Sequence, residues 1–196
     1  MPTITRIAVF CGSSSGNDPQ FLRTAAGVGK YIAESGMEVI YGGAQVGLMG
    51  AVADAALSAG GKVTGIIPGF LKTKEIAHTG LTELLVVDTM HARKLLMHDR
   101  SDAIIALPGG YGTLEELFEM LTWAQLGLHQ KPIGLLNVAG FYDGLIALAD
   151  TMAAQGFLKA DHRAMLLVAD DVAALLAQLR AWQAPTAPKW ITEETT

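Results

Sequence analysis

Short apolar runs of strand length alternate along the chain with longer segments in which apolar residues recur at helical spacing. The first apolar run, residues 4–10, stops at a glycine- and serine-rich turn; Asp18 then caps a helix that ends near Ser35, before Gly36. The same unit repeats along most of the chain. Further strands are expected at residues 37–41, 62–67, 83–87, 102–107, 132–136 and 165–168, with helices at about 48–59, 90–99 and 114–126 and after each of the last two strands.

Nearly continuous apolar strands separated by helices are typical of a parallel sheet that is covered on both faces. The pattern predicts an α/β, Rossmann-like doubly wound fold in a single domain, residues 1–182, followed by a C-terminal tail, residues 183–196. Ligands of such folds bind beyond the carboxyl ends of the strands. Because three strands end in glycine-rich turns, at 12–15, 42–43 and 109–112, we expect these turns to meet in one crevice.

Composition and charge argue against several classes of protein. With 196 residues, 51% of them hydrophobic, the chain can build a core without disulfides or a structural metal, and its one cysteine allows no intrachain disulfide. The net charge of −5 and the scattered Lys and Arg residues argue against nucleic acid as a partner. No apolar run has the length of a bilayer span, and residues 1–20 lack a signal-peptide pattern. We therefore expect a cytoplasmic protein with no membrane partner.

The most informative stretch, residues 108–116, reads Pro-Gly-Gly-Tyr-Gly-Thr-Leu-Glu-Glu and joins a predicted strand to a predicted helix. Its glycines let backbone N–H groups approach a ligand, and the helix N-terminus adds positive potential suited to phosphate. Glu115 stands where a dinucleotide fingerprint needs a third glycine, and the chain has no Walker-type phosphate loop. A phosphate cradle beside the acids Glu115 and Glu116 indicates an enzyme for a phosphorylated substrate.

The helix expected from Met90 carries a second motif. Arg93 shares a helical face with Met90 and Met97, which places its guanidinium among apolar neighbours. A desolvated arginine needs an anionic partner, and its planar fork suits a phosphate or a carboxylate. That partner is either a ligand or, in a purely structural ion pair, Asp99 or Asp102.

Together, the two motifs resemble those of the LONELY GUY (LOG) family, the cytokinin riboside 5′-monophosphate phosphoribohydrolases. Similar landmarks lie at residues 11–14, 41–43, 122–127 and 131–137, so that the resemblance covers about residues 4–175. Some relatives carry the label "possible lysine decarboxylase". That chemistry needs a pyridoxal phosphate Schiff-base lysine with its supporting site, and the sequence shows no such assembly.

The resemblance implies hydrolysis of the N-glycosidic bond in N6-modified adenosine 5′-monophosphates, and in AMP as a further candidate, to free base and ribose 5-phosphate. It implies that Arg93 and Glu116 are catalytic, and that no cofactor takes part. The histidines lack metal-ligand spacing, so no metal site is expected. The substrate-binding residues expected from the resemblance and from the glycine-rich turns are Glu75, Lys94, Gly109, Gly110, Tyr111, Gly112, Thr113, Glu115, Thr122, Gly12, Ser13, Gly42 and Gly43.

Several of these residues also have structural interpretations. Thr113 and Glu116 have the spacing of a capping box, in which Glu116 would only bond the start of the helix. The spacing alone favours that interpretation, whereas the glycine cradle and the resemblance favour catalysis. Glu115 fits a solvated first-turn acid slightly better than a catalytic group. Cys11, at a strand end, fits a small buried side chain better than a nucleophile.

A non-enzymatic nucleotide or molybdenum-cofactor carrier is the alternative function, because similar small Rossmann-like chains also hold phosphates with glycine-rich turns. A carrier needs no carboxylate beside a scissile sugar bond, so the joint presence of Arg93 and Glu116 favours the enzyme. The helix over 113–126 carries more large apolar residues than one buried stripe requires. This surplus predicts a homodimer.

Overall fold

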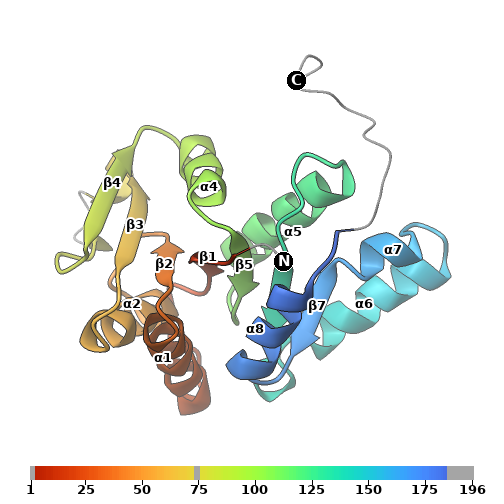
Figure 1. Cartoon of the computed structure of the whole chain (residues 1–196), viewed down its shortest axis with the longest axis horizontal. Helices are drawn as coiled ribbons and strands as arrows, with labels where there is room; N and C mark the ends of the chain where they lie inside the picture. Colours follow the sequence, from red (N-terminus) through yellow and green to blue (C-terminus); the bar gives the residue numbers. More distant parts are fainter. Residues whose placement is uncertain (1–2, 73–75, 185–196) are drawn as a thin grey trace.

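One sheet of seven parallel strands, in the order β4-β3-β2-β1-β5-β6-β7, runs through the computed structural model (Figure 1). The structure describes residues 3–72 and 76–184. The strands are β1 (Arg6–Phe10), β2 (Glu38–Tyr41), β3 (Val63–Pro68), β4 (Glu83–Val87), β5 (Ala103–Ala106), β6 (Ile133–Leu136) and β7 (Leu166–Ala169). The predicted α/β parallel sheet is confirmed.

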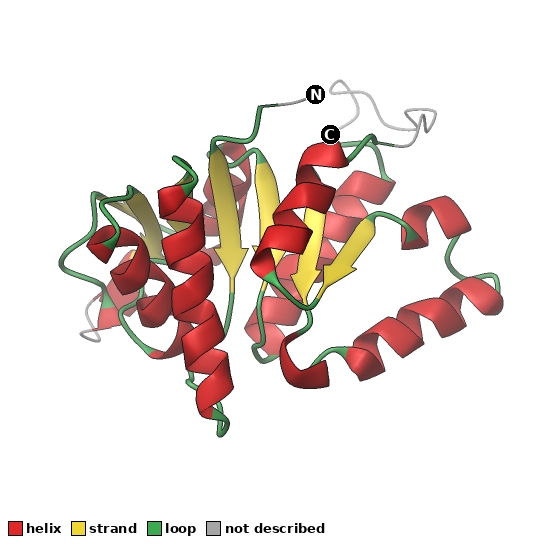
Figure 2. Ribbon diagram, turned by 60° about the horizontal axis from the view of Figure 1, so that its bottom comes forward, coloured by secondary structure: helices red, strands yellow, loops and turns green. Residues whose placement is uncertain are grey.

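Helices cover both faces of this sheet (Figure 2). They are α1 (Pro19–Glu34), α2 (Gly47–Ser58), α3 (Gly69–Leu71), α4 (Met90–Asp99), α5 (Tyr111–Gln125), α6 (Asp143–Ala154), α7 (Ala160–Arg163) and α8 (Val172–Ala181), with a 3₁₀ turn, η2, at Val138–Gly140. The helices α1, α2 and α8 pack into one core cluster, below the sheet in Figure 1, and α4 and α5 pack into the other, above it. The fold is therefore doubly wound, as predicted.

Local sequence explains these elements. All residues of β3, β5 and β6 are buried, as expected for parallel strands that are covered on both faces. Asp18 caps α1 by accepting the N–H of Gln20 at 2.8 Å. Gly29 of α1 lies so close to the carbonyl of Val52 on α2 that a Cβ at Gly29 would collide with it. The absence of a side chain at this point lets the two helices pack tightly.

The strand order reverses at β1, which lies between β2 and β5. The N–H of Gly12, just after β1, donates to the carbonyl of Pro108, after β5, at 3.0 Å. The N–H of Leu48 in α2 donates to the carbonyl of Gly12, also at 3.0 Å. These bonds hold the ends of both strands and the start of α2 together at the switch point, where doubly wound folds bind ligands.

Two predicted boundaries shift. The helix α5 begins at Tyr111 and not near residue 114, because Gly110 is its N-cap and the N–H of Leu114 already donates to the Gly110 carbonyl at 3.1 Å. The strand β1 begins at Arg6 and not at Ile4; the N–H groups of Thr5 and Arg6 both donate to the Asp102 carboxylate, at 3.0 and 2.9 Å, ahead of the pairing with β5. The tail from residue 185 lies outside the described residues, so the boundary after residue 182 stays a prediction. No helix in the described part of the chain is long and apolar enough to span a bilayer.

Candidate active site

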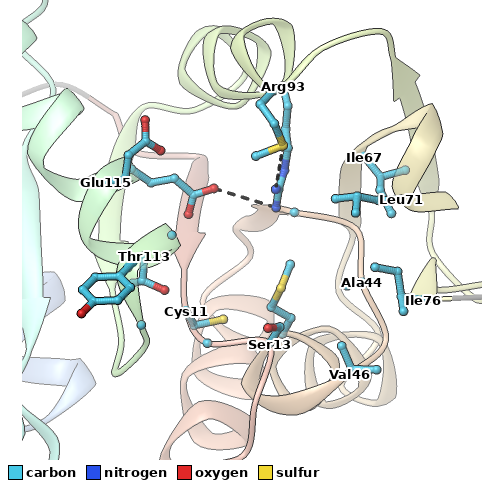
Figure 3. Close-up of a pocket in the computed structure, with 18 residues that line it drawn as sticks. Cys11, Ser13, Ala44, Val46, Ile67, Leu71, Ile76, Arg93, Thr113 and Glu115 are labelled. Carbon is cyan, nitrogen blue, oxygen red and sulfur yellow. Dashed lines mark hydrogen bonds and ion pairs between the residues drawn. The ribbon is translucent and has the colours of Figure 1, made fainter. Parts of the chain in front are cut away.

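A cavity of about 420 Å³ opens at the carboxyl edge of the sheet, between α4, α5 and the ends of β1, β2 and β3 (Figure 3). Each of the three glycine-rich turns contributes to its lining, so the prediction that they meet in one crevice is confirmed. The predicted site residues that line this cavity are Gly12, Ser13, Gly42, Arg93, Gly110, Tyr111, Gly112, Thr113, Glu115 and Glu116.

The start of α5 provides the donors for an anion. Because Leu114 makes the first helical hydrogen bond, the N–H groups of Tyr111, Gly112 and Thr113 precede the hydrogen-bond ladder of the helix. All three residues line the cavity. Gly109 makes the turn possible, since a Cβ at this position would collide with Oγ1 of Thr113. The turn and the helix N-terminus together form a phosphate-sized group of donors.

Arg93 and Glu116 face each other across the cavity from α4 and α5. Their Nη2 and Oε1 atoms are 3.8 Å apart, and each side chain is only 10% exposed. The guanidinium fits because Gly42 has no side chain: a Cβ there would collide with Nη2 of Arg93. On its other side, Nη1 of Arg93 lies 3.9 Å from the sulfur of Met90. The distance between the two groups allows electrostatic attraction but is too long for a strong hydrogen bond, so both groups can still bind a ligand.

Burial raises the pKa of Glu116 from 4.5 to about 7, although the neighbouring Arg93 lowers it. Glu115 raises it further, Lys94 lowers it and Glu119 raises it. The same surroundings act on Cys11, whose thiol pKa is raised by burial and by Glu116. At neutral pH Glu116 is therefore poised between its two protonation states, as is common for acid–base groups in active sites.

This raised pKa gives a first prediction, on stability. Between pH 4.5 and about 7, the folded protein binds more protons at Glu116 than the unfolded chain does. The free energy that protonation of Glu116 adds to the folded state is thus fully present below pH 4.5. It is lost as the pH rises through the folded-state pKa of about 7. In wild type the free energy of unfolding should fall by about 3 kcal/mol between about pH 4 and about pH 8 because of Glu116, and Glu116→Gln should remove this fall. Denaturant unfolding without nucleotide measures it; equal pH dependence in Glu116→Gln and wild type would contradict the buried ionisation.

The opposite side of the cavity is apolar. In Figure 3, Ile67, Leu71 and Ile76 line it on the right, facing the side that carries Thr113 and Glu115, with Arg93 between them. Ile76 is held by its carbonyl, which accepts the N–H of Gln45 at 2.8 Å. This wall could not be predicted from the sequence, because isolated apolar residues that line a cavity look the same as core residues.

The remaining predicted site residues lie elsewhere. Lys94 points to the carboxylates of α5, and Thr122 lines a separate apolar depression while its hydroxyl donates to the Phe118 carbonyl at 2.7 Å. Gly43, with a φ of +75°, completes the turn behind Gly42. Gly109 packs against the side chain of Thr113, at the turn before α5. Glu75 lies outside the described residues. The roles predicted for all the site residues stay predictions.

Of the structural alternatives for the two central residues, the capping box is wrong, whereas Arg93 does form an ion pair, with a partner other than the two aspartates expected. Gly110 is the N-cap of α5, so Thr113 lies inside the helix and no capping box forms with Glu116. Arg93 pairs with Glu116 and not with the aspartates considered from the sequence: Asp102 accepts bonds from Thr5 and Arg6, and Asp99 pairs with His98. Within residues 3–72 and 76–184, no three His, Cys, Asp or Glu side chains gather as a metal site would require.

Glu115 and Cys11 also have clear surroundings. Glu115 is half-exposed, contacts the Lys94 ammonium and lines the cavity, so it is more than a solvated first-turn acid. Cys11 is buried at the end of β1 and lines the cavity with its raised pKa, which keeps the thiol protonated at neutral pH. This agrees with its interpretation as a small buried side chain.

The chain is similar to known proteins over most of its length. The family model described as "Possible lysine decarboxylase" matches residues 49–179. A probable cytokinin riboside 5′-monophosphate phosphoribohydrolase of rice, LOGL1, is 49% identical over 177 residues, which cover 90% of this chain and 79% of the rice protein. The cytokinin riboside 5′-monophosphate phosphoribohydrolase of Rhodococcoides fascians is 47% identical over 181 residues, covering 92% and 91% of the two chains.

Solved structures share the fold at lower identity. The molybdenum cofactor carrier protein of Chlamydomonas reinhardtii superposes with a TM-score of 0.70 at 26% identity, covering 92% of this chain and all of the carrier. The molybdenum cofactor binding protein of Rippkaea orientalis gives the same TM-score at 25% identity, over 91% of this chain and 97% of that protein. The family-model match and the far higher identity to the phosphoribohydrolases decide the assignment: this chain belongs to the LONELY GUY family.

Proposed function

We propose that the protein hydrolyses the N-glycosidic bond of cytokinin riboside 5′-monophosphates, releasing the free base and ribose 5-phosphate. The observation that carries this proposal is the Arg93–Glu116 pair at 3.8 Å, in a cavity that also contains the free amides of α5. The phosphoribohydrolases of rice and Rhodococcoides fascians, at 49% and 47% identity, support the same activity.

The chemistry follows from the charges in the cavity. Breaking the bond between the base and C1′ develops positive charge on the ribose, and an ionised Glu116 stabilises that charge. Water then bonds to C1′, and the proton that it loses balances the proton that the departing base gains. With a pKa of about 7, Glu116 can accept a proton from this water near neutral pH. Arg93 favours the ionised form of Glu116 against the effect of burial, and it offers a bidentate donor to the sugar phosphate or its hydroxyls.

The two sides of the cavity suit the two ends of the substrate. The amides of Tyr111, Gly112 and Thr113 bind the 5′-phosphate, which is remote from the bond that breaks, so its binding energy orients the sugar. The apolar wall with Ile67 and Ile76 receives the base and its N6 substituent. AMP fills the same polar subsites and is a second candidate substrate.

The second prediction tests this function directly. Purified protein should release free base from N6-isopentenyladenosine monophosphate, in the presence of a chelator as well as without it, as measured by chromatography. The matching nucleoside, which lacks the phosphate, should be cleaved at least ~10²-fold more slowly, through kcat as well as KM. Equal cleavage of nucleoside and nucleotide would contradict the phosphate site, and nucleotide binding without any release of base would favour the carrier function.

We further propose a homodimer that uses the apolar surface of α5. Phe118 is 39% exposed, and it borders an apolar depression between α5, α6 and α7 that also contains Leu121 and the 87% exposed Phe157. Exposed apolar groups gathered at one groove are typical of a subunit interface. The second copy of the chain would also bring Thr122, which lines this depression, into the interface.

The third prediction concerns this assembly. Light scattering should give about twice the 20.7 kDa mass of the chain. Phe118→Glu should shift the mass toward the monomer, because it places a charge in the apolar interface, whereas Glu34→Gln on α1 should not change the mass. A wild-type monomer at micromolar concentration would contradict the proposal.

A further inference from the structure

Lys94 is buried between α4 and α5, and its charge is already matched there. Its Nζ lies 3.0 Å from Oε1 of Glu119 and also contacts Oε1 of Glu115. The Lys94 side chain is only 8% exposed and that of Glu119 only 18%. Lys94 does not line the cavity, whereas its neighbour Arg93 does. In this structure the ammonium therefore bonds across the contact between the two helices.

This contact lies directly behind the Arg93–Glu116 pair. Arg93 and Lys94 are consecutive on α4, and three ion pairs join them to α5: Arg93 pairs with Glu116, and Lys94 pairs with both Glu115 and Glu119. The inner pair is 3.8 Å long and faces the cavity, where a substrate competes for both partners. The closer, ligand-free pair of Lys94 and Glu119 is the one that can hold the distance between the helices.

The same cluster contributes to the electrostatic field at Glu116, after burial and Arg93, which have the largest effects. The charged and titratable groups that face Glu116 are Arg93 and Lys94 from α4, Glu115 and Glu119 from its own helix, and the Cys11 thiol from the end of β1. Lys94 lowers the pKa of Glu116 and Glu119 raises it, so that each opposes the effect of the other.

We propose that Lys94 and Glu119 are positioning residues, whose buried ion pair holds α4 against α5 and so fixes the spacing of Arg93 and Glu116. This inference rests on the proposed hydrolase activity, and it assigns to Lys94 a role different from the substrate contact that the family resemblance implies. Glu119 could be recognised only in the structure, because it lies one helical turn after the motif that contains Glu115 and Glu116.

The test compares Lys94→Met, Glu119→Gln and the double variant, with Glu34→Gln as the control. Glu34 forms an exposed ion pair with Lys30 on α1, at 3.6 Å. Both single variants should lower kcat roughly tenfold with KM changed less than about threefold, because misplacement of catalytic groups reduces turnover more than binding. The acid limb of the pH profile should move to higher pH in Lys94→Met and to lower pH in Glu119→Gln, because Lys94 lowers the pKa of Glu116 and Glu119 raises it.

The double variant separates positioning from charge. It removes one positive and one negative charge, so its pH limb should return close to that of the wild type while kcat stays roughly tenfold low. It also removes both partners of the buried pair, so no unpaired buried charge remains to prevent folding. Glu115 loses the ammonium as well, but its carboxylate is half-exposed to solvent. A double variant with wild-type kcat would overturn the proposal. So would a Lys94→Met variant that raises KM alone, since that result indicates a direct substrate contact.

A readout without turnover distinguishes failure of this inference from failure of the proposed function. The pH midpoint of the stability loss linked to Glu116, measured by unfolding, should move in the same opposite directions in the two single variants. If base release is absent in wild type but these shifts occur, the proposed function fails and the Lys94–Glu119 coupling to Glu116 stands. If base release is present and neither the midpoints nor kcat change, the positioning role is overturned.

Discussion

Glu116→Gln is expected to lower kcat by about 10²–10³ with little change in KM, the range found when one transition-state electrostatic group is removed. The substitution keeps the shape of the side chain but removes its charge, so it cannot stabilise positive charge on the ribose. Because Glu116 is buried beside Arg93 and does not cap α5, the amide should not weaken the start of the helix. Steady-state rates at about pH 8, where the wild-type carboxyl is ionised, give the measurement.

The control for this prediction is the stability of the same variant. Above neutral pH, Glu116→Gln should unfold at the same or a higher temperature than wild type, because it no longer buries a charge that burial disfavours. Glu34→Gln should leave the rate unchanged. A Glu116→Gln protein with wild-type kcat would remove Glu116 from the chemistry and leave its burial unexplained.

Arg93→Lys should lose about 10²-fold or more in kcat, as should Arg93→Ala. The lysine keeps the positive charge, so this variant separates charge from geometry: a single ammonium cannot reproduce a planar, bidentate donor. The guanidinium is placed beside the bare Cα of Gly42 and 3.8 Å from Glu116, where the shorter reach of lysine leaves a gap. Full activity in Arg93→Lys would exclude the bidentate role.

Chemical rescue supplies the matched test for Arg93. In Arg93→Ala, the space beside Gly42 becomes empty, and added guanidinium should restore part of the turnover there while leaving Arg93→Lys unchanged. Rescue of neither variant, with both folded, would point to a structural role for Arg93 in the contact between α4 and α5. Binding of the nucleotide, measured in parallel, shows whether the loss lies in kcat or in affinity.

Local sequence was sufficient for the elements of the fold. Parallel strands that are buried on both faces must be almost wholly apolar, so β5 and β6 can be recognised as short apolar runs, and β3 contains a single polar residue, Thr64. Asp18 could be recognised as a cap because the bond to Gln20 spans only two residues. The boundary of α5 could not be recognised in the same way. Three glycines in four positions leave several starts for the helix, and the tight fit of Gly109 against Thr113 selects one of them.

Local sequence also predicted most of the polar residues and glycines that line the cavity, but not their arrangement. The motifs identified Arg93 and Glu116 with their family resemblance, and the glycine-rich turns predicted one crevice. Neighbouring residues on a helix point about 100° apart, and which of them faces the cavity depends on how the helix packs on the sheet. Arg93 therefore lines the cavity while Lys94, one residue later, pairs with Glu119. The apolar wall of Ile67 and Ile76 was likewise invisible, because β3 and the segment after α3 meet only in the folded chain.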